Sequence, residues 1–262
     1  LLTGAAALGA RLGPTLADER RVGILMPPSV AGLLANAALS LQGRTVVNLN
    51  WTVPPDAFRS AVAQSGLRHI LTSRRFTQAL NLPEAQASLI YLEDALAGLT
   101  LREKAAAFLR ARFAPLSRLT SGRTPQPTDE ACVIFSSGST GTPKGVALTH
   151  ANLLSNLDAL QTVVPVTARD TLCATLPFFH SFGYLGTIWW PLLTGIRTAY
   201  HANPLQPAFV LRLLREARAT VLLTTPTLLQ TYLRRAAPGD LASLRHVFTG
   251  GDGQWINGQA GP

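Results

Sequence analysis

The sequence predicts an α/β fold in which parallel-rich sheets are flanked by helices. Short apolar segments of strand length alternate with longer segments of helical character, which is typical of βαβ units. Proline and glycine stand where several of the helical segments begin and end. The chain has 262 residues, 47% of them hydrophobic and 14% charged, so we expect a folded chain with one large domain or two smaller ones.

The first alternation runs from residue 21 to residue 73. It contains three strand-like segments and two helical ones, and the first helical segment ends at Gly43, a C-cap signal. The strands are expected at 21–27, 44–50 and 67–73, and the helices at 29–43 and 54–66. This order implies parallel pairing, because the connection from one parallel strand to the next usually contains a helix.

A second alternation follows a polar linker at 118–130. A strand at 131–135 leads into a Gly/Ser/Thr loop, and the loop leads into a helix at 148–160 capped by Thr149. Strands, a "FFHSFG" turn and further helices then alternate as far as residue 252. We divide the chain into a first α/β subdomain with a basic helix and linker (1–130), a strand–loop–helix unit (131–168), an incomplete second α/β subdomain (169–252) and an atypical tail (253–262).

Composition narrows the function classes. The formal net charge of +9 comes from scattered arginines without interleaved aromatic residues, so nucleic-acid binding is the weakest interpretation. Cys132 and Cys173 lie in apolar segments and give neither a disulfide framework nor metal-ligand spacing, so we expect buried thiols in a reducing compartment and no metal site. Prolines and polar residues interrupt both long uncharged stretches, which we interpret as protein core. No signal peptide is visible, and a cytoplasmic location is expected.

The segment "LREKAAAFLRARF" at 101–113 has a basic amphipathic pattern. Five apolar residues (Leu101, Ala105, Phe108, Leu109 and Phe113) share one side of the helical wheel. A basic helix of this kind can lie on an anionic membrane surface. The alternative is an ordinary surface helix packed on its own domain, and base rates favour this second arrangement.

The stretch "SSGSTGTPKG" at 136–145 has the composition of a phosphate-binding loop. Its glycines allow backbone N–H groups to approach phosphate oxygens, and its hydroxyl groups add hydrogen-bond donors. The chain has only two lysines, Lys104 and Lys144, among its 23 basic residues, so a lysine in place of an arginine here indicates a specific role. A compact ammonium group suits a polyphosphate. The spacing differs from GxxxxGK[ST], because Pro143 precedes the lysine and Gly145 follows it, so this is a phosphate loop of another kind.

"SSGSTGTPKGV" resembles the signature loop of the adenylate-forming superfamily, which comprises acyl-CoA synthetases, luciferases and peptide-synthetase adenylation domains. "VALTHANL" and "LPFFHSFG" resemble two further family motifs, and "TGGD" stands where the family usually has Gly-Ala-Glu or Gly-Gly-Glu. The resemblance implies an incomplete N-terminal large domain of the acyl-adenylate-forming fold. "RVGILMP", "ILTSRRF", "IYLEDAL" and "PLLTG" resemble one branch, the synthetase half of bacterial acyl-ACP synthetase/2-acylglycerophosphoethanolamine acyltransferase.

The resemblance implies a two-step reaction. A carboxylate, here expected to be a fatty acid, attacks the α-phosphate of ATP, and a pantetheine thiol of acyl carrier protein or CoA then accepts the acyl group. His180 would lie near the carboxylate and α-phosphate, and Lys144 would bind phosphate. The other residues that bind the nucleotide would be Ser136, Ser137, Gly138, Ser139, Thr140, Gly141 and Thr142 at the β- and γ-phosphates, and Gly250, Gly251 and Asp252 at the adenine. Asp252 departs from the family's glutamate, and His150 more simply starts a helix.

Several family elements are missing after Asp252. They include the element with the Mg²⁺ ligand, the ribose-binding aspartate and the C-terminal domain with its catalytic lysine, so we expect these 262 residues alone to be inactive. Two alternatives keep the chemistry, a fatty-acyl-CoA ligase and a peptide-synthetase adenylation domain. A third, of another class, is a non-catalytic nucleotide-binding remnant. For the acyl-ACP branch, the cytoplasmic face of the bacterial inner membrane is the expected location.

Overall fold

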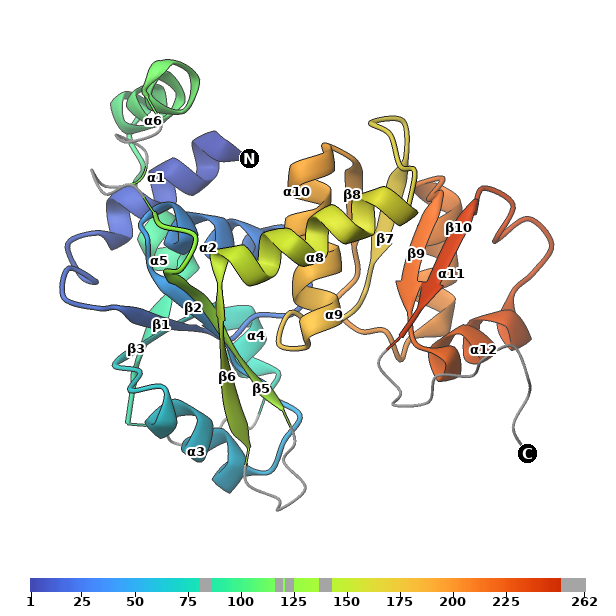
Figure 1. Cartoon of the computed structure of the whole chain (residues 1–262), viewed down its shortest axis with the longest axis horizontal. Helices are drawn as coiled ribbons and strands as arrows, with labels where there is room; N and C mark the ends of the chain where they lie inside the picture. Colours follow the sequence, from blue (N-terminus) through green and yellow to red (C-terminus); the bar gives the residue numbers. More distant parts are fainter. Residues whose placement is uncertain (81–85, 116–119, 121–124, 137–142, 251–262) are drawn as a thin grey trace. The chain divides into compact units, whose positions relative to one another are not determined.

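The computed structural model describes residues 1–80, 86–115, 120, 125–136 and 143–250. The chain divides into two compact units, Leu1–Asn156 and Leu157–Pro262 (Figure 1). Each unit is built around its own sheet, with helices packed on it. The mixed α/β fold with parallel-rich sheets is therefore confirmed. The finer sequence division at residues 130 and 168 stays a prediction.

The sheet of the first unit has six strands in the order β4-β3-β1-β2-β5-β6. The pairs β1–β2, β1–β3, β2–β5 and β3–β4 are parallel, as the sequence predicted for the first three strands. The pair β5–β6 is antiparallel. The strands are β1 (Arg21–Ile24), β2 (Thr45–Asn48), β3 (His69–Thr72), β4 (Ser88–Tyr91), β5 (Glu130–Ser136) and β6 (Lys144–Thr149).

Helices cover both faces of this sheet because its strands send alternate side chains to opposite sides. Val46 belongs to the apolar cluster beneath α1 and α2, whereas its neighbour Val47 belongs to the cluster beneath α3. Gly43 and Gly66 follow α2 and α3 with φ of 68° and 61°, so both helices end in the left-handed conformation that glycine favours. The helices are α1 (Leu2–Leu12), α2 (Val30–Leu41), α3 (Pro55–Gln64), α4 (Arg74–Gln78), α5 (Leu92–Leu96) and α6 (Leu101–Phe113).

The expected strand–loop–helix order around residues 136–148 is wrong. After the loop the chain first forms β6, which pairs with β5, and α8 (His150–Val163) begins only at His150. The predicted helix start at residue 148 was too early because Leu148 and Thr149 still belong to the strand. The predicted cap is confirmed: the Asn152 amide donates to Thr149 Oγ1 at 3.2 Å, and the Thr149 amide donates to Asn152 Oδ1 at 3.0 Å.

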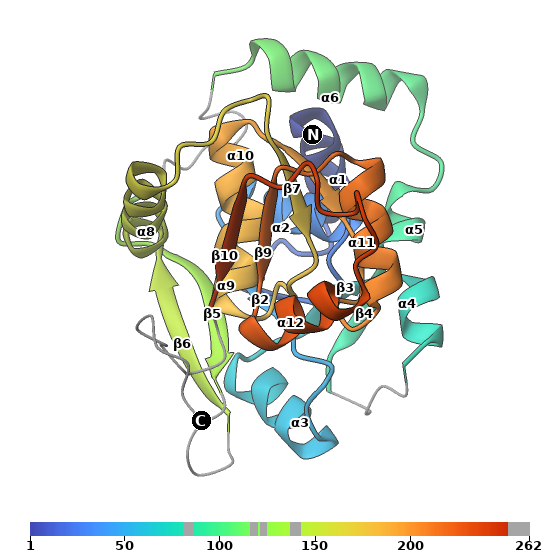
Figure 2. The same ribbon diagram turned by 90° about the vertical axis from the view of Figure 1, so that its right-hand side faces the viewer.

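The second unit carries a parallel sheet in the order β10-β9-β7-β8, three strands of which are seen side by side in Figure 2. The alternation predicted for residues 171–250 is present. Its elements are β7 (Thr171–Ala174), α9 (Ser181–Tyr184), a π-helical turn η1 (Leu185–Trp189), α10 (Trp190–Thr194), β8 (Arg197–Tyr200), α11 (Pro207–Glu216), β9 (Val221–Thr224), α12 (Pro226–Arg235) and β10 (His246–Thr249). Trp190 is fully buried in the core between sheet and helices.

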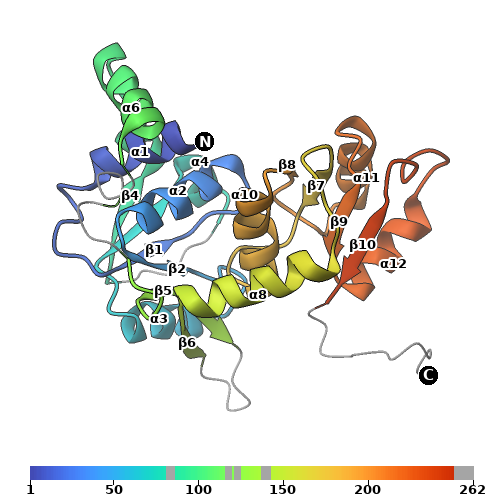
Figure 3. The same ribbon diagram turned by 45° about the horizontal axis from the view of Figure 1, so that its top comes forward.

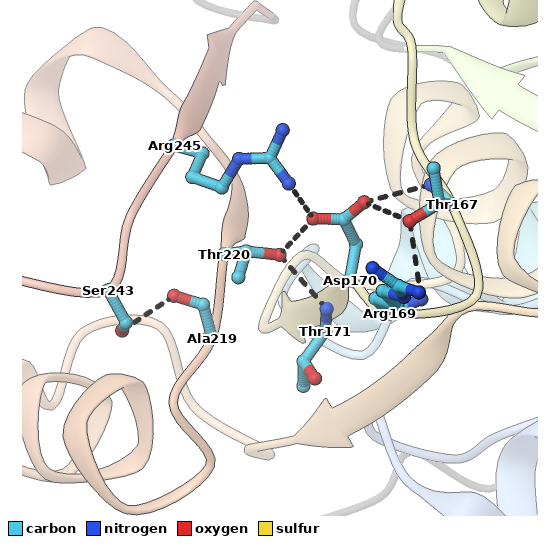
Figure 4. A network of polar contacts seen from close by, with 8 residues as sticks. All are labelled: Thr167, Arg169, Asp170, Thr171, Ala219, Thr220, Ser243 and Arg245. Carbon is cyan, nitrogen blue, oxygen red and sulfur yellow. Dashed lines mark hydrogen bonds and ion pairs between the residues drawn. The ribbon is translucent and has the colours of Figure 1, made fainter.

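A buried aspartate joins the amino ends of three of these strands (Figure 4). Asp170, which precedes β7, is 0% exposed. Its carboxylate accepts hydrogen bonds from the Thr167 amide (2.8 Å) and the Thr220 hydroxyl (2.7 Å), and it forms an ion pair with Arg245 (3.0 Å). Burial by itself raises the pKa of Asp170, but the hydrogen bonds from Thr167 and Thr220 and the charge of Arg245 outweigh burial, so the pKa is lowered.

We expect Asp170→Asn to destabilise the chain by about 2–4 kcal/mol at neutral pH, because it removes the charge that Arg245 and the two threonines compensate. The measurement is the free energy of unfolding from denaturant titration. The matched control is Asp158→Asn on the exposed side of α8, for which we expect a change within about 0.5 kcal/mol.

The loss of stability in Asp170→Asn relative to the wild type should depend on pH. Because the pKa of Asp170 is lower in the folded chain, its contribution is complete above the unfolded value of about 4 and is lost as the pH falls through the folded value. The difference in stability between wild type and Asp170→Asn should therefore narrow below about pH 4. A difference that stays constant down to pH 2 would contradict this account of the network.

Candidate functional site

The glycine- and hydroxyl-rich segment at 136–145 has a cross-strand pair at its base. Ser136 is the last residue of β5, Lys144 is the first residue of β6, and the two are register partners in the antiparallel ladder. Both are exposed. Opposite residues in such a ladder have Cβ atoms about 5 Å apart. The structure thus brings these two predicted site residues together, while Ser137, Gly138, Ser139, Thr140, Gly141 and Thr142 lie outside the described residues.

Two contacts support this base. A Cβ added at Gly145 would lie 3.1 Å from the Phe135 ring and from Val133, so glycine lets β6 lie close against β5 next to Lys144. The Gln64 side chain, at the end of α3, donates a hydrogen bond to the Pro143 carbonyl at 3.0 Å. The residues on either side of Lys144 are therefore positioned by elements distant in the sequence.

The second group of predicted residues lies at the carboxyl edge of the sheet in the second unit. His180 follows β7, and Gly250 follows β10, and the two strands are parallel members of one sheet. Ligands of open parallel sheets bind beyond the carboxyl ends of the strands. The sheet therefore places His180 and Gly250 at the edge where a ligand is expected, whereas Gly251 and Asp252 lie outside the described residues.

His180 is held in a turn anchored by two buried phenylalanines, Phe178 and Phe179. Its amide donates to the Pro177 carbonyl at 3.3 Å, its carbonyl accepts from the Tyr184 amide at 2.7 Å, and its ring lies 4.6 Å from the Phe179 ring. His180 is nevertheless exposed, so the surrounding chain removes it from water only in part. This partial burial lowers the pKa of His180, which favours the neutral imidazole at pH 7.

Two residues that the sequence did not single out as site residues lie next to Gly250. The Gly250 amide donates to the Thr224 carbonyl at the end of β9 (3.2 Å). A Cβ added at Gly250 would lie 3.6 Å from the Phe182 ring, two residues after His180. The available signal was that Thr224 ends one parallel strand and that His180 and Phe182 follow another, but which strands lie side by side depends on strand order, which local patterns do not give.

Gly183 explains the glycine of the "HSFG" motif. A Cβ at this position would lie 2.1 Å from the Pro177 carbonyl oxygen and 3.1 Å from the Leu176 carbonyl oxygen. Real Cβ atoms do not approach backbone so closely, and the backbone cannot move aside as a flexible side chain can. Glycine therefore allows the first turn of α9 to fold back on the segment that carries His180.

The remaining histidine with a family match, His150, is the first residue of α8, as predicted, and its amide donates to the Asp129 carbonyl at 3.1 Å. Burial lowers the pKa of His150. Among the residues that the structure describes, no three His, Cys, Asp or Glu side chains gather as metal ligands would. Cys132 and Cys173 are both buried, as the sequence predicted.

We expect Gly183→Ala to destabilise the chain by about 1–3 kcal/mol, because the new methyl group would force the Pro177 carbonyl or α9 to move. Unfolding by denaturant gives the magnitude. Gly250→Ala is the matched control, since its methyl group would make an ordinary contact with Phe182 and should change stability by less than about 0.5 kcal/mol. Equal effects of the two substitutions would contradict the close approach at Gly183.

Known proteins share sequence with about half of this chain. Acyl-CoA ligase SID4 of Ajellomyces capsulatus is 34% identical over 140 residues, which cover 52% of this chain and 24% of the relative. The medium-chain fatty-acid–CoA ligase of Escherichia coli is 33% identical over 135 residues, covering 51% of this chain and 24% of the relative. The chain thus spans about a quarter of the length of these curated relatives.

Among solved structures, the fatty acid AMP ligase of Legionella pneumophila superposes with a TM-score of 0.76 at 22% identity. The superposition covers 95% of this chain and 43% of that chain, and it shows a shared fold. The family model described as AMP-binding enzyme matches residues 3–254, nearly the whole chain. The chain belongs to the AMP-binding enzyme family, and its relatives include acyl-CoA ligases.

Proposed function

We propose that the protein to which this chain belongs activates a fatty acid with ATP, forming an acyl-adenylate that is passed to a pantetheine thiol. The observation that carries the proposal is the Ser136–Lys144 pair, which closes a glycine- and hydroxyl-rich loop with a lysine at its base. The carboxylate oxygen attacks the α-phosphorus, the bond to the β-phosphate oxygen breaks, and pyrophosphate leaves. Negative charge grows on the pyrophosphate, so fixed donors there lower the barrier most directly.

Each predicted residue has a role in this proposal. Ser136, the loop residues 137–142 and Lys144 would hold the β- and γ-phosphates, with the lysine following the charge onto pyrophosphate. His180, whose lowered pKa favours the neutral imidazole, would hydrogen-bond near the carboxylate and α-phosphate. Gly250, Gly251 and Asp252 would line the adenine pocket, with the aspartate reaching less far than the family's glutamate. The described residues gather no metal-ligand group, so we assign no Mg²⁺ ligand within them.

Different observations support the identity of the acid substrate and that of the thiol acceptor. The names of relatives such as the E. coli medium-chain enzyme support an acyl-CoA product. The sequence resemblance to the acyl-ACP branch supports acyl carrier protein as the acceptor and phospholipid remodelling as the role. A peptide-synthetase adenylation domain is the alternative with an amino acid as substrate. If the protein is an acyl-ACP synthetase of this branch, we expect it on the cytoplasmic face of a membrane.

We expect Lys144→Ala to weaken ATP binding to the 262-residue chain by about tenfold or more, because one charge-assisted contact with phosphate is lost. Isothermal titration or a fluorescent ATP analogue would measure the dissociation constant. Lys104→Ala, the other lysine of the chain, is exposed on α6 and serves as a control with unchanged affinity. If both variants bind ATP like the wild type, Lys144 has no role at the phosphates.

We expect the 262 residues alone to bind ATP without carboxylate-dependent exchange of pyrophosphate, and we expect the longer parent protein to catalyse that exchange. Radiolabelled pyrophosphate with a series of fatty acids and amino acids would separate the two substrate classes. Acyl carrier protein and CoA, offered in turn, would identify the acceptor.

Exchange by the 262-residue chain itself would refute the expected inactivity. ATP binding without exchange by the intact parent would instead favour a non-catalytic nucleotide-binding remnant.

A further inference from the structure

Helix α6 turns its large apolar side chains outward. The side chains of Leu101, Phe108, Leu109 and Phe113 are 83%, 54%, 54% and 70% exposed, whereas Ala107 is buried. The helix packs on α1, at the margin of the first unit (Figures 1 and 3). The helix therefore packs on its own domain, as base rates favour, but its large apolar side chains lie outside that contact.

The packed side of α6 is small and polar. Glu103, Ala106, Ala107 and Arg110 line the groove shared with Ala6, Ala10 and other residues of α1. At about 100° per residue, positions 103, 107 and 110 lie on the opposite side of the helix from 101, 105, 108 and 109. The apolar side therefore faces away from the contact with α1.

Polar contacts fix this orientation. Thr100 and Glu103 form a capping box, in which each side chain accepts a hydrogen bond from the other residue's backbone amide (3.2 and 2.8 Å). Glu103 also forms an ion pair with Arg11 of α1 at 2.9 Å. The sole acidic side chain of the helix is thus engaged on the α1 side. It neutralises none of the charge on the outer side.

The exposed side is basic as well as apolar. Arg102, Lys104 and Arg112 are exposed beside the apolar side chains, and the Arg112 guanidinium lies 5.3 Å from the centre of the Phe113 ring. Long basic side chains can lay their methylene groups along an apolar surface while their charged ends reach anionic headgroups. This combination matches the requirements of a helix lying in the plane of an anionic bilayer surface.

The area is too small for a stable protein dimer. The four apolar side chains expose roughly 500 Å² in total if each has an area of about 200 Å². A standard protein interface needs about 800 Å² from each partner. No helix within the described residues is long and apolar enough to cross a membrane, so a contact through α6 would be one that lies on the surface.

We propose that α6 docks the first unit onto an anionic lipid surface, with Leu101, Phe108, Leu109 and Phe113 inserted among the headgroups and Arg102, Lys104 and Arg112 at the phosphates. The inference does not depend on the ligase reaction, because it rests on the orientation of α6 alone.

The test is co-sedimentation of the 262-residue chain with vesicles of phosphatidylcholine, with or without phosphatidylglycerol. We expect binding to the anionic vesicles that weakens with salt. The triple variant F108A/L109A/F113A should lower the partition coefficient at least about tenfold. The variant R102Q/K104Q/R112Q should do the same on anionic vesicles and remove their advantage over neutral ones. Circular dichroism and thermal unfolding would verify that each variant folds.

The matched control is V163A/L193A/L205A, which removes three side chains of the second unit that are 77%, 52% and 75% exposed and should leave binding unchanged. A wild type that fails to sediment, an apolar variant that binds as well as wild type, or a control variant that loses binding equally would each overturn the proposal. So would a change in self-association of F108A/L109A/F113A, seen by sedimentation velocity without lipid, if vesicle binding were unchanged. In that case the apolar side of α6 contacts a second copy of the chain and not a lipid surface.

A fluorescent label tests the orientation directly. Both native cysteines are buried, and burial raises the pKa of the Cys173 thiol to about 12, so neither should compete for a thiol-reactive dye. An environment-sensitive dye on Leu109→Cys should shift to the blue with anionic vesicles, whereas the same dye on Ser155→Cys, at an exposed position of α8, should not. Equal shifts at both positions would contradict docking through α6.

Discussion

Strand β5 connects the edge strand β6 to the rest of the first sheet, because it pairs with β2 on one side and with β6 on the other. It is parallel to β2 through Val46–Cys132 and Val47–Val133, and antiparallel to β6 as far as Ser136–Lys144. Its first residue, Glu130, accepts two hydrogen bonds from Arg21 of β1 (2.7 and 2.8 Å), which lower the pKa of the Glu130 carboxyl. The start of β5 is thus fixed to the central strands, and its end carries the loop. These pairings fix the positions of Ser136 and Lys144, the described residues that we propose contact phosphate.

The second unit has different kinds of contact at the two edges of its sheet. At the amino edge of its sheet, the buried Asp170 ties the segments before β7, β9 and β10 together by ionic hydrogen bonds. At the carboxyl edge, the contacts are close backbone approaches, at Gly183 and between Gly250 and Thr224, and the His180 ring remains exposed. A sheet that is held rigidly at its amino edge can fix the positions of exposed groups at its carboxyl edge without covering them. This division is expected where a parallel sheet presents a ligand site.

The parts of the fold that the sequence predicted are those set by local patterns. The strands β1 to β3 are apolar segments bounded by turn residues, and Thr149 and Gly43 are caps whose hydrogen bonds or φ angles involve near neighbours. Strand β6 was missed because its residues are largely exposed and its extended form depends on pairing with β5. The contact of Phe182 with Gly250 could not be foreseen either, since it requires the order of β7, β9 and β10 in the sheet.

Helix α6 shows most sharply what a helical wheel leaves open. The wheel found the apolar side and the bounds 101–113 correctly, and the structure shows that Thr100 and Glu103 form a capping box at the start. It could not tell which side packs, since that choice depends on the partner. The partner, α1, reads "LTGAAALGARL" and offers a small-residue surface on which alanines of α6 can approach closely. Phenylalanine and leucine side chains there would hold the helices apart and separate Glu103 from Arg11. The alanine side therefore faces the protein, and the large apolar side chains are left for whatever lies outside it.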